Sequence, residues 1–244
     1  MQEHHFDLTT ADGDMPVWVM HPDGTGPYPV VLFLMDAPGM RQEIRDMAMR
    51  VATSGYWVIT AQQYYREVRE FNLFGQEITG QDMKRMYELM GGLSNAMVDA
   101  DAASMLERAS ADPRADATRV GVAGYCMSGP FAISIAATHH AVVRAAASFH
   151  GVALATDRED SPHRRLADVQ GEVYVAHAEL DTHIEAPEVA EFEQALAAAG
   201  TAGRVEHFAG LDHGFTFPGR PAYDRIGAET HWERLLDLFA RTLV

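Results

Sequence analysis

The sequence has little of three features that would direct it to particular functions: cysteine, basic side chains and long apolar runs. One cysteine among 244 residues excludes an internal disulfide and a cysteine-based zinc site. The 19 basic residues are outnumbered by 35 acidic ones, and the net charge of −16 repels nucleic-acid phosphates and anionic lipid. We therefore expect neither a nucleic-acid partner nor a membrane partner.

The longest apolar run has eight residues, from Tyr28 to Met35 with Pro29 included, whereas a bilayer-spanning helix needs roughly 20. The first residues also lack the basic and then apolar pattern of a secretory signal, so we expect a cytoplasmic protein. Hydrophobic residues make up 47% of the chain, which suits a packed globular protein. The length predicts one domain over residues 1–244.

Short apolar runs alternate with helical patterns along the chain. Strands are expected at Val30–Met35, Tyr56–Ala61, Arg119–Gly124, Val142–Phe149, Glu172–His177 and Arg204–Phe208. Several of these runs are apolar on both faces, as buried parallel strands are. Apolar stripes at helical spacing lie between them and after them, the last one from Trp232 to Phe239. The pattern predicts an α/β fold in three layers, with a mostly parallel, doubly wound sheet.

The segment 62–92 interrupts this alternation. It is long and rich in aromatic residues and methionine, from Tyr64 to Met90. Two readings stay open: an additional packed helix and loop, or a wall or partial cap over a ligand pocket.

The residues from Gly124 to Gly129 carry the strongest chemical signal. A strand ends there and a helical pattern follows, so Cys126 occupies a sharp strand-to-helix turn. Such a nucleophile elbow requires small residues two positions before and two positions after the nucleophile, and Gly124 and Ser128 meet that requirement. The turn places the thiol near a helix N-terminus, which favours the thiolate. Ser128 is the rival nucleophile, although it has no glycine two positions before it.

An elbow nucleophile needs a carboxylate and a histidine, in that order along the chain. Asp181 follows the strand 172–177, and His213 lies in a glycine-bracketed loop after the next strand. These residues, with Cys126, form the predicted catalytic triad. Glu179 is the rival acid, and Asp212 is more simply a turn-forming residue. His150, His177 and His183 end or follow strands and are candidates to line the pocket.

At this point the chain resembles the dienelactone hydrolase family of α/β-hydrolases, over nearly its whole length. The resemblance rests on Cys126, Asp181 and His213, and on the stretch from Met35 to Gly39 after the first buried strand. It implies an α/β-hydrolase fold and hydrolysis of carboxylic esters or lactones without a cofactor. It also implies that the backbone amides of Ala37 and Met127 form the oxyanion hole, and that Asp36 stands where the family has a thiol-activating glutamate.

The chain departs from the family where dienelactone is bound. The family has serine directly after the catalytic histidine and arginine three residues later, and Gly214 and Phe217 stand there. We therefore expect an apolar or neutral ester or lactone. Candidate pocket residues are Tyr125, Arg85, His150, Phe215 and Phe217. Lys84 or Arg85 would be the cation for a substrate that carries a carboxylate.

Other functions stay open beside a carboxylesterase. The same triad suits a thioester hydrolase or a phosphotriester hydrolase, and a small-molecule-binding protein could keep the pocket without catalysis. The sequence has neither a nucleotide-binding glycine motif nor a spaced ligand set for a catalytic metal, so we expect no cofactor and no metal. It carries no signal for an oligomeric state.

Overall fold

The computed structural model describes residues 1–74 and 77–244. The chain divides into two compact units, Met1–Thr118 and Arg119–Val244, which are described in turn. The predicted segment 62–92 lies in the first unit, and its residues 75–76 fall outside the described ones. The single domain over 1–244 stays a prediction.

The first unit orders its strands β1 (Gln2–Thr10), β2 (Gly13–His21), β4 (Trp57–Ala61) and β3 (Tyr28–Phe33). β1 pairs with β2 as an antiparallel hairpin, with Gln2 opposite His21 and Thr10 opposite Gly13. β2 also runs antiparallel to β4, and only β3 and β4 are parallel. The hairpin was not predicted, because β1 is largely exposed and lacks a buried apolar run.

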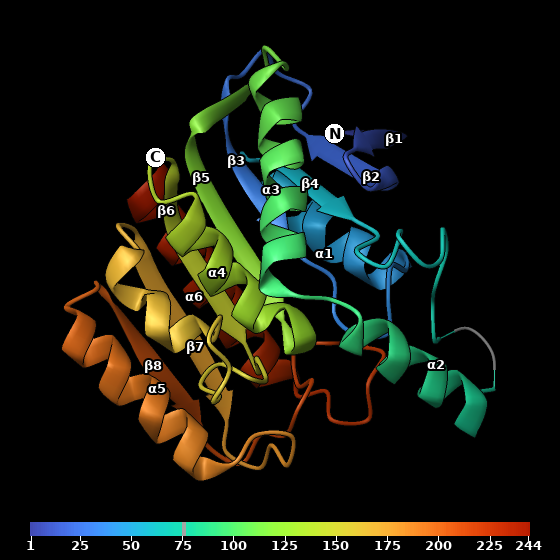
Figure 1. The fold of residues 1–244 in the computed structure, drawn as a ribbon. Coiled ribbons are helices and arrows are strands. Elements are labelled where there is room, and N and C mark those ends of the chain that lie inside the picture. The colour runs from blue at the N-terminus through green and yellow to red at the C-terminus, as the bar shows by residue number, and fades with distance from the viewer. Residues whose placement is uncertain (75–76) are drawn as a thin grey trace. The chain divides into compact units, whose positions relative to one another are not determined.

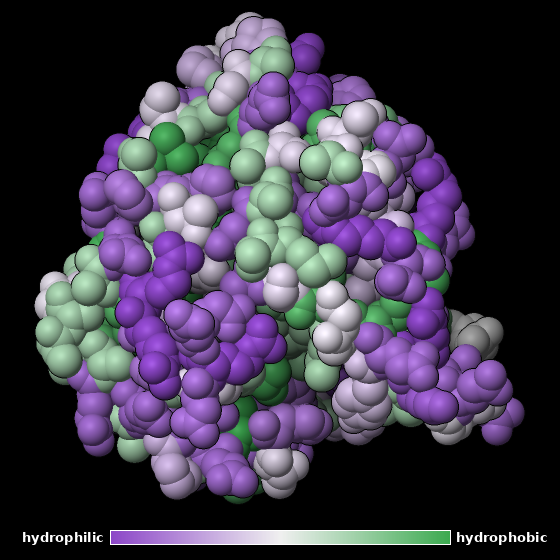
Figure 2. Space-filling view, viewed as in Figure 1, coloured by the Kyte–Doolittle hydropathy of each residue, from purple (hydrophilic) through white to green (hydrophobic). Residues whose placement is uncertain are grey.

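The described residues of this unit form three helices: α1 (Gln42–Thr53), α2 (Gly80–Gly91) and α3 (Asn95–Ser110). α1 buries the predicted stripe from Ile44 to Val51. α2 begins at a capping box between Thr79 and Asp82, and only Met86 and Leu89 of it are buried. Its remaining surface is largely hydrophilic (Figure 2).

The second unit is built on parallel strands in the order β5 (Ala115–Tyr125), β6 (Val143–Phe149), β7 (Glu172–Ala178) and β8 (Gly203–Phe208). In the register, Gly124 pairs with Ser148, and Phe149 pairs with Ala176. The carboxyl ends of β5, β6 and β7 therefore meet at one edge, which is where open α/β sheets hold their ligands. The core of this unit lies along these strands, whose inner residues are buried.

Helices cover both faces of these strands. α4 (Gly129–Thr138) and α5 (Ala186–Ala199) lie on the near face in Figure 1, and α6 (Arg225–Leu243) lies on the far face. Two short 3-10 turns complete the unit, η1 (Cys126–Ser128) and η2 (Pro162–Asp168). The predicted layered α/β architecture with a largely parallel sheet is confirmed, and the antiparallel strands at its start are an addition to it. No helix among the described residues is long and apolar enough to cross a membrane.

Candidate active site

Cys126 sits at a strained turn directly after β5. Its backbone has φ of 53°, in the left-handed region that non-glycine residues rarely adopt. The turn is held by the Ser128 hydroxyl, which accepts a hydrogen bond from the Tyr125 backbone N–H at 2.8 Å and donates one to the Tyr125 carbonyl at 3.1 Å. The Val152 N–H also donates to the Cys126 carbonyl, at 3.2 Å. These bonds fix the direction of the Cys126 side chain.

The neighbours of Cys126 are as small as the elbow prediction requires. A Cβ added to Gly124 would lie 2.1 Å from the Ser128 carbonyl oxygen, far inside contact distance. Ser128, the rival nucleophile, is fully buried and has its hydroxyl committed to the Tyr125 backbone. α4 starts at Gly129, so the positive end of its macrodipole lies beside the thiol.

Asp181 follows β7 in a turn closed by a hydrogen bond from its own N–H to the Ala178 carbonyl. Its side chain is 0% exposed. One carboxylate oxygen lies 2.6 Å from Nδ1 of His213, and the other accepts the His183 backbone N–H at 2.8 Å. Burial alone would raise the pKa of Asp181, but the hydrogen bond and the charge of His213, with help from His183, lower it. Asp181 is therefore an ionised acceptor at neutral pH.

His213 lies in the loop after β8, between Gly210 and Gly214, both of which adopt positive φ. The Asp212 carboxylate accepts the His213 backbone N–H at 2.6 Å, as expected of a turn-forming residue. The His213 side chain is 6% exposed. Burial opposes its protonation, but hydrogen bonds to Asp181 and Cys126 and the charges of both raise the pKa of His213 to about 10. The second unit thus brings Cys126, His213 and Asp181 into one contiguous chain of contacts.

Glu179, the rival acid, is placed differently. Its carboxylate accepts the backbone N–H of Gly210 at 2.7 Å, and no hydrogen bond from it to His213 occurs among the described residues. Glu179 thereby ties the loop after β7 to the loop after β8. It supports the loop that presents the histidine.

The aromatic pocket candidates form a cluster behind His213. Tyr125, Phe215 and Phe217 are each 0% exposed. The Tyr125 hydroxyl bonds Nε2 of His231 at 2.8 Å, and the Phe217 ring centroid lies 5.5 Å from that of Tyr125. This cluster forms an apolar core beside the loop that carries His213.

His150 joins the same cluster and is fully buried. Its Nε2 bonds the Thr216 hydroxyl at 2.9 Å, and its ring meets that of His213 at 5.0 Å between centroids. Burial first, and then the positive charges of His213 and Arg220, hold the pKa of His150 well below its usual value. His150 is therefore a neutral side chain that packs against His213.

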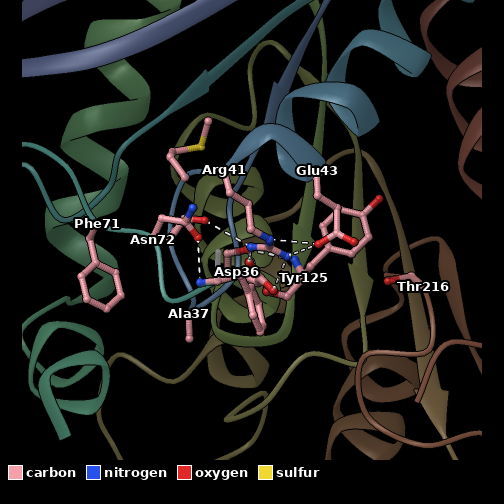
Figure 3. Close-up of polar contacts among 12 residues, drawn as sticks. Asp36, Ala37, Arg41, Glu43, Phe71, Asn72, Tyr125 and Thr216 are labelled. Carbon is pink, nitrogen blue, oxygen red and sulfur yellow. Dashed lines mark hydrogen bonds and ion pairs between the residues drawn. The ribbon is translucent and has the colours of Figure 1, made fainter. Parts of the chain in front are cut away.

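Asp36 and Ala37 belong to the first unit, and both are buried. Arg41 lies between Asp36 and Glu43 (Figure 3) and binds both carboxylates, with one guanidinium nitrogen 3.2 Å from Oδ2 of Asp36. The Ala37 carbonyl accepts the Tyr64 hydroxyl at 2.8 Å. Arg85, on α2, is half-exposed and lies 3.6 Å from Glu88.

Several side chains of this region were not singled out from the sequence. His231 supports Tyr125, Thr216 holds His150, and the guanidinium of Arg220 lies 5.5 Å from the Phe217 ring centroid. The contacts of His231 and Thr216 join distant parts of the chain, so no local pattern signals them. His183 was named as a pocket candidate only because it stands two residues after Asp181.

Two side chains of the predicted triad, together with His183, have the composition of a metal site. Asp181, His183 and His213 each offer a donor atom, and the three atoms lie within 4.8 Å of one another.

Comparison with known proteins places this chain in a family. The model of the dienelactone hydrolase family matches residues 15–243. A Synechocystis protein provisionally named carboxymethylenebutenolidase is 27% identical over 229 residues, which cover 93% of this chain and 91% of that protein. A protein from Salmonella typhi with the same provisional name is 28% identical over 239 residues, covering 96% and 85%.

A solved structure gives the same result. The crystal structure of a protein from Klebsiella pneumoniae subsp. pneumoniae, provisionally described as a dienelactone hydrolase, superimposes with a TM-score of 0.87. The two sequences are 26% identical, and the match covers 98% of each chain.

Proposed function

The chain belongs to the dienelactone hydrolase family, a family of carboxylic-ester hydrolases, and from this premise we propose that it cleaves small esters or lactones with Cys126 as nucleophile. The observation that carries the proposal is the 2.6 Å hydrogen bond between Asp181 and His213, beside a Cys126 that is near enough to raise the pKa of His213. Such an arrangement activates a nucleophile that is weak by itself.

In the proposed mechanism, His213 takes the proton of Cys126 and holds it as an imidazolium. The raised pKa of His213 supports that state. The thiolate attacks the ester carbonyl, and the tetrahedral intermediate collapses to an acyl-thioester while His213 gives its proton to the leaving alkoxide. Neutral His213 then takes a proton from water, the resulting hydroxide attacks the thioester, and the thiolate leaves. Asp181 keeps the imidazole in one orientation and tautomer throughout.

Two backbone amides are proposed to stabilise the oxyanion of both tetrahedral intermediates. The Met127 N–H follows the nucleophile in η1, and the Ala37 N–H follows Asp36. Each donor of this kind is typically worth about 2.7–4 kcal/mol in the transition state.

The proposed substrate is neutral or apolar near the catalytic histidine. Phe217 stands where the family has an arginine, and it is buried in the aromatic cluster. Gly214, in place of the family's serine, adds no hydroxyl beside His213. An acyl group with apolar substituents therefore suits these surroundings better than a carboxylate.

The first test is hydrolysis of p-nitrophenyl acetate by the wild type, Cys126→Ala and Ser128→Ala. We expect turnover to fall by about a hundredfold or more in Cys126→Ala. Ser128→Ala should keep turnover within about tenfold, because its hydroxyl supports the turn and does not attack. Mass spectrometry of the quenched wild type should find an acetyl group on Cys126.

Two outcomes would contradict this proposal. Turnover that survives in Cys126→Ala and is lost in Ser128→Ala would make Ser128 the nucleophile. No turnover of p-nitrophenyl, thiophenyl or phosphotriester substrates by any variant would favour a small-molecule-binding protein on a hydrolase scaffold.

Asp36 is proposed to activate the thiol when substrate binds. Because Arg41 binds its carboxylate, Asp36 would have to share that carboxylate between the guanidinium and the thiol. Asp36→Ala should change the pH dependence of acylation more than it changes KM. Glu43→Ala is the matched control, since Glu43 binds the same guanidinium. An acylation profile identical to that of wild type would remove Asp36 from the mechanism.

A further inference from the structure

His183 adds a third titratable side chain to the pair formed by Asp181 and His213. Its Nδ1 lies 3.3 Å from Oδ1 of Asp181, while Nδ1 of His213 lies 2.6 Å from Oδ2. The two imidazole rings pack at 4.4 Å between centroids. The proposed hydrolysis uses His213 and Asp181 and leaves His183 without a task.

The three side chains differ in access to solvent. The His183 side chain is 56% exposed, whereas those of Asp181 and His213 are 0% and 6% exposed. A dissolved ion would therefore reach His183 first. The exposed ring is held by a long hydrogen bond to Asp181 and by packing against His213, so it has room to rotate.

The donor set suits a borderline cation. Two imidazole nitrogens and one carboxylate oxygen are ligands that Zn²⁺ takes in proteins, whereas Mg²⁺ prefers oxygen alone. In a tetrahedral zinc site with bonds of about 2.1 Å the ligand atoms lie about 3.4 Å apart. The donor atoms here lie within 4.8 Å of one another. Nδ1 of His213 and Oδ2 of Asp181, now 2.6 Å apart, would separate to admit the ion, and rotation of the exposed His183 ring would bring in the third donor.

We propose that Asp181, His183 and His213 form a site for Zn²⁺ whose occupation reversibly inhibits the enzyme. The inhibition rests on the proposed function, whereas the binding of zinc does not. Zinc on Nδ1 of His213 would replace the proton that this nitrogen shares with Asp181. The imidazole would then no longer be oriented by Asp181 or able to transfer protons with Cys126.

Zinc bound at this site would replace the 2.6 Å hydrogen bond between Nδ1 of His213 and Asp181, the contact that orients the imidazole. Catalysis needs no metal in this scheme, and His183 is the residue that converts the acid and histidine of the triad into a three-ligand site.

The kinetic test compares zinc inhibition of p-nitrophenyl acetate hydrolysis by the wild type, His183→Asn and His207→Asn. The His183→Asn variant would keep the backbone N–H that bonds Asp181 at 2.8 Å, so activity without zinc should stay within about threefold of wild type. His207 is the matched control, because its side chain is 53% exposed and bonds the Glu193 carboxylate. We expect the half-inhibiting zinc concentration to rise at least about tenfold in His183→Asn and to stay unchanged in His207→Asn.

A second measurement does not depend on activity. Calorimetric titration of Zn²⁺ into Cys126→Ser should show binding that His183→Asn in the same background removes and His207→Asn keeps, and Mg²⁺ should give no such signal. Equal zinc affinity with and without His183 would overturn the inference, as would equal zinc inhibition of the wild type and His183→Asn. If the wild type hydrolyses no ester, the proposed function fails while the titration still decides whether the site exists.

Discussion

Asp181 forms a hydrogen bond through each of its two carboxylate oxygens. His213 bonds one oxygen through its ring, and the His183 backbone N–H bonds the other. Both contacts favour the ionised form, and together they outweigh the burial that opposes it. A single buried carboxylate thereby bonds the His213 ring and, together with Cys126, favours its protonated form.

Replacing Asp181 with Asn should cost about three to four orders of magnitude in kcat, because the amide removes the charge that stabilises the imidazolium and favours the wrong tautomer. The pKa of His213, followed by NMR, should fall from about 10 toward its ordinary value. Asp212→Asn is the control, since the Asp212 carboxylate accepts the backbone N–H of His213. An equal loss of kcat in Asp212→Asn would show that loop structure, not charge on the ring, sets the activity.

The junction of β5 and α4 is the element on which the site depends. The strand must end, reverse into the left-handed region at Cys126 and enter η1 within four residues, from Tyr125 to Ser128. Side-chain size decides whether the backbone can do so. The Ser128 hydroxyl supplies the hydrogen bonds of the turn, and Gly124 leaves room for the Ser128 carbonyl.

Gly124→Ala should lower the free energy of unfolding by about 3 kcal/mol or more, because the new Cβ would overlap a carbonyl oxygen that cannot move independently. Gly91→Ala is the control. Gly91 lies within α2, and a Cβ there meets nothing within 4 Å, so stability should change by less than about 1 kcal/mol or rise. Denaturant unfolding of both variants checks the difference, and an unaltered Gly124→Ala midpoint would refute the steric argument.

Most of the strands could be predicted from the sequence, whereas contacts between distant residues could not. β3 to β7 were predicted because each has an apolar run, β8 was predicted without one, and the strand ends differ from the prediction by a few residues. β1 was missed because it is largely exposed and has no apolar run, and β2 was missed although it contains the run from Met15 to Met20. Cys126, Asp181 and His213 could be found by local turn chemistry and chain order. The Tyr125–His231 pair and the His183–His213 contact could not, because they join positions that only the fold brings together.

The roles of Asp36, Ala37 and Met127 stay predictions, as does the cytoplasmic location. Asp36 illustrates the reason. Its identity follows from the resemblance, but its partner Arg41 stands five residues later with no pattern to mark it. Electrostatic partners of this kind are set by packing.

For the whole molecule, the ionisation of His213 couples the active site to folding. The pKa of His213 is about 10 in the folded protein and near 6.5 in an unfolded chain. Between these values the folded state holds a proton that the unfolded state releases, so stability falls as the pH rises. The contribution of His213 is complete below about pH 6.5 and is lost as the pH passes through about 10.

We therefore expect the stability difference between wild type and His213→Gln to shrink as the pH is raised from 6.5 to 10, by at most about 1.4 kcal/mol per pH unit. Chemical denaturation of both proteins across this range measures it. Using the difference between the two cancels groups that titrate identically in both proteins. A difference that stays constant over this range would show that His213 is not protonated in the folded protein.

Cys126 is the only thiol in the chain, and it is partly exposed. Peroxide would convert a thiolate in this position to a sulfenic acid, which many redox-active proteins rescue by forming a disulfide with a second cysteine. No second cysteine exists here, so recovery would depend on small thiols in the surroundings. Without them, continued exposure to peroxide would oxidise the sulfur to the sulfinic and sulfonic acids and inactivate the enzyme irreversibly.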